Sequence, residues 1–256
     1  MHIRRAQASD LPACADIVAA ALCDEELIAY LCPRRREYWD EYRDSALRRI
    51  KRRFYSPGWV LWVAVTDEKD GEEEGKVVGY AAWHRIGEGE EASRWKKSVA
   101  GGDGGWLWMT WCGFQHSLVT LSNRIIDAMD LDPSLDRERL AAVEALVKDN
   151  FPSSIFPEMW YLATLVVDPS YQRRGIGKLL LQWAIEQATE ERVPIGLEAS
   201  SIGEKLYEKM GFRSFKWIEF EKGSTKKPVM LWEPEALHED ESWFERARRA
   251  ARQSES

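Results

Sequence analysis

A buried strand that leads through a glycine-containing turn into a helix is the feature that most restricts how this chain can fold. Residues 165–181 (LVVDPSYQRRGIGKLLL) start with an apolar run, pass through an Asp-Pro turn and end with the apolar spacing of an amphipathic helix. Gly175 and Gly177 let the backbone approach a ligand without a Cβ atom in between. The N–H groups at the helix start carry the positive end of the helix dipole, so the segment predicts a pyrophosphate site.

Two common phosphate-binding motifs do not fit this turn. The dinucleotide fingerprint needs a third glycine three residues after the second, and Leu180 occupies that position. The nucleotide P-loop needs Ser or Thr after its Gly-Lys pair and a further glycine before it, where this chain has Leu179 and Gln172. The pattern that remains is Gln-x-x-Gly-x-Gly over residues 172–177.

This pattern resembles the pyrophosphate-binding motif of the GNAT superfamily, the acetyl-CoA-dependent N-acetyltransferases. Residues 193–200 predict a second short strand, and residues 202–210 predict a helix that contains Leu-Tyr and is followed by Gly-Phe. The superfamily carries these features in the same order and at about the same distance. The resemblance covers residues 2–87 and 158–232, and it implies an α/β (α+β) fold with a mixed, mostly antiparallel sheet flanked by helices.

The rest of the chain supplies the other elements of such a fold. Apolar spacing predicts strands at 3–7, 58–66, 76–86, 214–221 and 228–232, and helices at 11–22, after Pro33, at 117–129 and at 137–148. An acidic turn at 67–75 joins two of these strands as a hairpin, and residues 88–157 form an insertion with a glycine-rich loop at 101–105. We therefore expect one domain over residues 1–232 and a charged tail with a surface helix over 233–256.

By resemblance, the cofactor site combines the first cofactor strand, the turn and the helix that follows the second strand. The two strands splay apart in the superfamily, so the backbone of the first bonds the pantetheine arm and polarises the acetyl carbonyl. The residues implied in binding acetyl-CoA are Leu165, Val166, Val167, Gln172, Arg173, Arg174, Gly175, Ile176, Gly177, Lys178, Ser201 and Gly203. The three cations among them oppose the dipole of the helix they begin, which favours a bound anion over ordinary surface positions.

Tyr207 is the predicted general acid. Its phenol is protonated at neutral pH, can donate to a departing thiolate, and occupies a position similar to that of the superfamily's acid. The alternative is a tyrosine that only packs its helix against the sheet. The general base stays unassigned, because Tyr161 stands where some relatives have a glutamate. Glu158, His84 and Asp168 are candidates beside a water chain, and each also has an ordinary structural explanation.

Composition restricts the partners. With 256 residues and 45% hydrophobic content the chain can bury a full core, and its net charge of −7 argues against a nucleic-acid binder. No apolar run reaches ~18 residues and the N-terminus lacks the apolar core of a signal peptide, so we expect a soluble, cytoplasmic protein without a membrane partner. Four widely spaced cysteines predict free thiols and no metal site.

The acceptor is the least determined part of the prediction. The insertion at 88–157 contains Trp95, Trp106, Trp108 and Trp111 and is expected to cover the acceptor side of the cleft, although these side chains also suit a core of the insertion itself. The acidic net charge favours a cationic amine or a peptide N-terminus. Two functions remain open: an N-acetyltransferase acting by direct attack in a ternary complex, as a monomer or homodimer, and a noncatalytic acyl-CoA-binding module.

Overall fold

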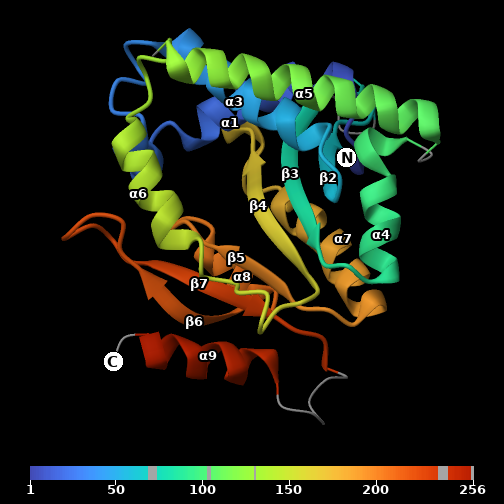
Figure 1. The fold of residues 1–256 in the computed structure, drawn as a ribbon, viewed down its shortest axis with the longest axis vertical. Helices are drawn as coiled ribbons and strands as arrows, with labels where there is room; N and C mark the ends of the chain where they lie inside the picture. The colour runs from blue at the N-terminus through green and yellow to red at the C-terminus, as the bar shows by residue number, and fades with distance from the viewer. Residues whose placement is uncertain (69–73, 103–104, 130, 236–241, 255–256) are drawn as a thin grey trace.

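The computed structural model describes residues 1–68, 74–102, 105–129, 131–235 and 242–254. One sheet runs through this part of the chain, with seven strands in the order β1-β2-β3-β4-β5-β7-β6 (Figure 1). The strands are β1 (His2–Arg5), β2 (Trp59–Val65), β3 (Val77–Ile86), β4 (Met159–Val167), β5 (Ile195–Glu198), β6 (Arg213–Ile218) and β7 (Lys227–Trp232). Only β4 and β5 pair in parallel, which confirms the predicted mixed, mostly antiparallel sheet.

Helices cover both faces of the sheet. They are α1 (Leu11–Leu22), α2 (Glu26–Leu31), α3 (Trp39–Phe54), α4 (Glu90–Lys97), α5 (Trp106–Ala128), α6 (Arg137–Val147), α7 (Ile176–Glu191), α8 (Glu204–Lys209) and α9 (Trp243–Ser254). Helices α1 and α3 pack on one face of β2 to β4, and α7 packs on the other. Both faces of these strands are therefore buried, which explains their nearly continuous apolar sequences.

The spacing of apolar residues in α3 explains which side of this helix packs inward. Tyr42, Ala46, Ile50 and Phe54 recur at helical spacing in α3, and all four are buried. Ala46, Ile50 and Phe54 pack with α1 on one face of the β2–β3 hairpin, and Tyr42 packs in a smaller cluster with Leu31 and Val143. No helix in the described ranges has the length and apolar character needed to cross a membrane.

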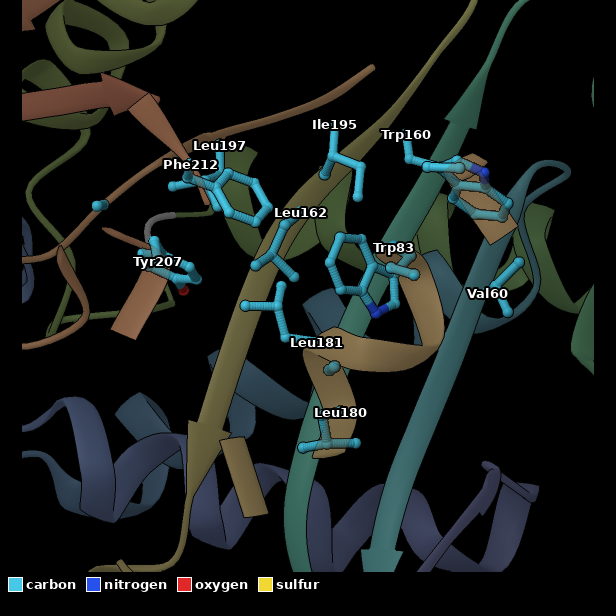
Figure 2. Close-up of a cluster of buried hydrophobic side chains, with 14 of the residues drawn as sticks. Val60, Trp83, Trp160, Leu162, Leu180, Leu181, Ile195, Leu197, Tyr207 and Phe212 are labelled. Atoms are coloured by element: carbon cyan, nitrogen blue, oxygen red, sulfur yellow. The ribbon is translucent and has the colours of Figure 1, made fainter. Parts of the chain in front are cut away.

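The larger core cluster lies between the sheet and α7. Trp83 and Trp160 are fully buried there, together with Leu180 and Leu181 of α7. Figure 2 shows Trp83 near the middle of this cluster and Tyr207 at one side of it. The core therefore extends from the sheet to the helix that carries the predicted acid.

Most predicted elements are present, with different boundaries. The structure adds two helices that were not predicted, α2 and α4, and α5 begins eleven residues before the predicted start at residue 117. The cause is local composition, since the first half of α5 contains Thr, Gly and several Trp residues, which are poor or middling helix formers. Within the predicted acidic turn, glycine-rich loop and C-terminal tail, residues 69–73, 103–104, 236–241 and 255–256 lie outside the described residues.

The tryptophans of the segment 88–157 do not share one role. Trp95 joins the main core, with its ring centroid 5.3 Å from that of Trp160. Trp108 donates from Nε1 to the Val99 carbonyl at 2.7 Å. Trp106 is 78% exposed and Trp111 is 51% exposed. The alternative that these side chains form a core of the insertion itself therefore does not hold for Trp95, Trp106 or Trp111.

Candidate active site

The strands β4 and β5 part from each other in the middle of the sheet. They pair in parallel over three residue pairs, the last of which is Leu162 with Leu197. Beyond Leu162, β4 continues to Val167 paired with β3, and no further pair with β5 occurs in the described part of the chain. The edge of β4 that faces the gap therefore presents backbone groups without a strand partner, at the predicted positions 165–167.

A bulge in β4 coincides with this separation. The register with β3 shifts between Ala82 and Trp83, whose partners are Thr164 and Leu162, so Ala163 is the extra residue. A bulge turns neighbouring side chains and local backbone groups out of the regular ladder. Here it does so at the point where β4 loses β5 as a partner.

The predicted phosphate turn begins directly after β4. Gly175 is the N-cap of α7 with φ at 84°, and Arg173 also has a positive φ of 66°. The side chains of Arg173 and Lys178 are exposed, and the first N–H groups of α7 have no acceptor within the helix. This geometry gives an anion several backbone donors, the helix dipole and neighbouring cations in one place.

Side-chain contacts hold the turn in this conformation. Gln172 donates from Nε2 to the Val167 carbonyl at 3.2 Å, which ties the turn to the end of β4. The Arg174 guanidinium lies 4.7 Å from the Tyr171 ring centroid. Ile176 is buried beneath the turn. Gln172 and Ile176 therefore shape the turn, whereas the side chains of Arg173 and Lys178 face solvent.

The two motif glycines serve different purposes. A Cβ on Gly175 would meet no atom within 4 Å, so the positive φ is the reason for glycine there. A Cβ on Gly177 would lie 3.1 Å from Leu206 and 3.5 Å from Leu165. Gly177 thus allows α7 to approach α8 and β4, and its role beside a ligand stays a prediction.

The start of α8 lies opposite this turn, across Gly177. The Gly203 N–H donates to Ser200, 3.0 Å from its carbonyl oxygen and 3.1 Å from its Oγ, so this amide is engaged in capping. The Ser201 Oγ is 3.4 Å from the Lys227 ammonium. Gly203 is needed for packing, because a Cβ there would come within 2.9 Å of the Tyr207 ring.

The Tyr207 side chain projects from α8 toward the edge of the hydrophobic core. Its ring centroid lies 5.7 Å from that of Phe212, and the side chain is 7% exposed. Burial raises the pKa of the phenol above its usual value, so it is protonated at neutral pH. No hydrogen bond joins the hydroxyl to any described residue, which leaves the predicted proton donor free for another acceptor.

The three candidate bases all have structural roles. The Glu158 carboxylate accepts from the amides of Glu88 and Gly89 at 2.7 Å and lies 2.7 Å from Arg85, and these contacts lower its pKa. Asp168 accepts from the Ser170 amide at 2.8 Å and so forms the turn after β4.

His84 lies on β3, on the α1/α3 face of the sheet. It stacks on Trp59 with the ring centroids 4.7 Å apart. Burial lowers its pKa to about 4, so the imidazole is neutral and a weak base near pH 7.

A carboxylate that the sequence pattern did not indicate lies at the gap between the strands. Glu198 ends β5, and its Oε2 accepts a 2.7 Å hydrogen bond from the Tyr161 hydroxyl, while Oε1 accepts from the Asn150 amide at 2.8 Å. The Lys216 ammonium donates to the other side of Asn150 at 3.0 Å. Burial raises the pKa of Glu198, and burial with the adjacent carboxylate raises the pKa of Tyr161. The available signal was a single charge in the otherwise uncharged strand VPIGLEAS.

A cation lies on the same face of the sheet. Arg53 of α3 donates from Nη1 to the Thr164 hydroxyl at 2.8 Å, and its guanidinium lies 4.9 Å from the Trp59 ring centroid. No described carboxylate pairs with it. The gap is therefore bordered by one buried carboxylate and one guanidinium, together with the hydroxyls of Tyr161 and Thr164.

Comparisons with known proteins agree with this geometry. The sequence model of the acetyltransferase (GNAT) domain matches residues 136–214, which include β4, the turn, α7, β5 and α8. Residues 136–214 therefore carry the sequence features of a GNAT acetyltransferase domain. The match begins at the start of α6, inside the segment that was predicted to be an insertion.

Two individual proteins are similar to this chain, one in sequence over part of its length and one in fold. A protein of Stachybotrys chartarum described as an acetyltransferase is 34% identical over 87 residues, which span 32% of this chain and 37% of that protein. A crystal structure of a histone acetyltransferase HPA2 and related acetyltransferase from Corynebacterium glutamicum has a TM-score of 0.55 at 18% identity. It covers 91% of this chain and 96% of its own, so the fold is shared over nearly the whole length.

Proposed function

We propose that this protein is a GNAT-type N-acetyltransferase that transfers the acetyl group of acetyl-CoA to a primary amine by direct attack in a ternary complex. The observation that carries the proposal is the unpaired edge of β4, which runs directly into the glycine turn at the start of α7. A pantetheine arm needs an extended row of backbone donors and acceptors, and a pyrophosphate needs a helix N-terminus. In this chain the unpaired edge of β4 and the N-terminus of α7 follow each other directly.

The cofactor residues act in two groups. The backbone of Leu165, Val166 and Val167 bonds the pantetheine arm and donates to the acetyl carbonyl as negative charge develops on its oxygen. The amides from residues 173–178, with the exposed side chains of Arg173 and Lys178, hold the pyrophosphate. Acetyl-CoA itself supplies the activated acyl group as a thioester.

Two proton transfers complete the reaction. The acceptor nitrogen forms a bond to the acetyl carbon while the carbon–sulfur bond breaks, and the amine gives up one proton. We assign that proton to the Glu198 carboxylate, directly or through Tyr161, because the pair borders the gap where β4 is open. Tyr207 gives its phenolic proton to the departing thiolate, and its uncommitted hydroxyl supports this role.

The test measures free thiol released from acetyl-CoA across a panel of primary amines, with an amine-free reaction as the blank. Because Arg53 has no described carboxylate partner, the panel includes each amine with and without an acidic group. Stimulated thiol release with a matching acetylated amine by mass spectrometry is the expected result. Calorimetric binding of acetyl-CoA without turnover on any amine would contradict the proposal and indicate an acyl-CoA-binding module. Absence of binding would exclude both.

A further inference from the structure

Helix α5 exposes a continuous apolar stripe. The α5 stripe consists of six side chains that are 46–74% exposed: Leu107, Trp111, Phe114, Leu118, Leu121 and Ile125. Successive members are separated by four, three, four, three and four residues. This is the repeat that keeps apolar side chains along one side of a helix in a two-helix seam.

The opposite side of α5 already holds the helix on the molecule. Cys112 is buried there, and the His116 Nδ1 lies 3.0 Å from the Ser56 Oγ at the end of α3. Figure 1 shows α5 lying along the outer edge of the molecule beyond α3. The stripe is therefore not needed to attach α5, and its exposure is not explained by packing within one chain.

The exposed area is larger than a monomer usually leaves open. From the exposed fractions, the six side chains and the flanking Trp106 and Met129 present roughly 1,000 Å² of surface, whereas the largest apolar patch on a typical monomer is about 300–600 Å². A stable protein interface buries about 800 Å² per partner. One copy of α5 thus provides an area sufficient for a dimer interface.

Charge distinguishes a protein partner from a lipid surface. Helices that lie on membranes carry Lys and Arg on the polar face, where they meet anionic lipid headgroups. Residues 106–123 contain no charged side chain at all, and the whole chain has a net charge of −7. A second α5 has the same uncharged, regularly spaced surface, so it is complementary without any counter-charge.

We propose that the α5 stripe is the interface of a homodimer, in which α5 of two copies packs as a left-handed two-helix seam. The isologous contact places the same six side chains on both sides of the interface. The proposal depends only on the fold of α5 and not on the acetyltransferase assignment.

Sedimentation equilibrium of the full chain at about 1–50 μM tests this assignment. The wild type is expected at twice the chain mass of 29.6 kDa, and Leu118→Glu is expected to be monomeric with an unchanged circular dichroism spectrum. Ser117→Glu is the matched control, because it adds the same charge one residue away at a flanking position and leaves the dimer intact.

Three outcomes would overturn the proposal. The first is a monomeric wild type throughout this range. The second is a dimer that persists in Leu118→Glu and also in Phe114→Glu. The third is a monomeric wild type that sediments with phosphatidylcholine and phosphatidylserine vesicles while Leu118→Glu does not, which would assign the stripe to a membrane surface.

Discussion

The Tyr161 hydroxyl donates a 2.7 Å hydrogen bond to the Glu198 carboxylate across the last pairs of β4 and β5. The bond lies where the two strands separate and where the backbone edge of β4 becomes free. Because burial raises the pKa of Glu198, the carboxylate is a stronger base than an exposed glutamate. The contact therefore places a proton acceptor beside the predicted acetyl site.

Glu198→Gln is expected to lower kcat/KM at least about 100-fold, since general-base catalysis contributes about 100-fold to 10,000-fold. Glutamine keeps the size of the side chain and can still accept from Tyr161, but it does not take a proton. In the wild type, kcat/KM rises with pH as Glu198 loses its proton, at a pKa above that of an ordinary glutamate. The variant is expected to lack this ionisation. The measurement is the pH profile of kcat/KM at saturating acetyl-CoA.

Asn150 provides the control for that experiment, because it contacts the same carboxylate without a titrating group. Asn150→Ala is expected to shift the rising limb of the profile and to leave it present. A Glu198→Gln enzyme with an unchanged profile would exclude Glu198 as the base.

Tyr207→Phe is expected to reduce kcat about 10-fold to 100-fold and to leave the affinity for acetyl-CoA unchanged. The reason is that the hydroxyl has no hydrogen bond to a described residue, so its removal costs little packing but removes the proton donor. Single-turnover thiol release and calorimetry measure the two quantities. Equal losses of affinity and rate would indicate a packing role instead.

Gly175→Ala tests the phosphate turn. A left-handed backbone at φ 84° disfavours alanine by about 1 kcal/mol, and a rearranged turn loses amide contacts to the pyrophosphate. We expect the Kd for coenzyme A to rise about tenfold or more. Gly223→Ala is the matched control, because its φ is 88° and its Cβ also meets nothing within 4 Å. It is expected to cost similar stability with no change in affinity.

The sequence was sufficient to predict the sheet and the glycine turn before α7 because these depend on local patterns. Branched and aromatic runs define β2, β3 and β4, and the turn needs only the order of a strand, two glycines and a helix. Short elements such as α2, with six residues, contain too few apolar repeats to be recognised. Its stability comes from packing against α6 and from the Glu25 cap.

The candidate base was not predictable because it depends on three segments far apart in the chain. Tyr161, Glu198 and Asn150 come from β4, β5 and the residues after α6, and only the folded sheet brings them together. Proximity in sequence favoured Glu158 and Asp168. In the fold, Glu158 holds the amides just before α4 and Asp168 forms a turn. A long-range hydrogen bond of this kind leaves no periodic signal in a single sequence.

His84 is expected to make the free energy of unfolding depend on pH. Its folded pKa of about 4 lies below the usual value near 6.5, so the unfolded chain takes up a proton first as the pH falls. The contribution of neutral His84 to the free energy of unfolding is therefore present above about pH 6.5 and is lost toward pH 4. Between pH 7.5 and pH 5 this loss is about 2 kcal/mol. His84→Gln removes this contribution. Urea unfolding of both proteins at the two pH values measures the difference, and equal losses would refute the assignment.

Among the ion-paired residues of the core, Arg85 is expected to be the one whose substitution lowers stability most. The guanidinium is 2% exposed and contacts the Glu191 carboxylate at 2.6 Å, and the Glu191 side chain is also 2% exposed. Arg85→Met leaves Glu191 buried without its cation, which costs about 3–5 kcal/mol. For a chain of this size, that lowers Tm by roughly 10 °C or more. Thermal unfolding followed by circular dichroism measures the shift.

The double variant separates an unpaired charge from lost packing. Arg85→Met with Glu191→Gln removes both charges, so part of the stability is expected to return relative to Arg85→Met alone. Trp95 donates to the other Glu191 oxygen at 2.8 Å, and a glutamine can still accept this bond. A double variant as unstable as the sum of the two single variants would show that the buried charge on Glu191 is not the source of the loss.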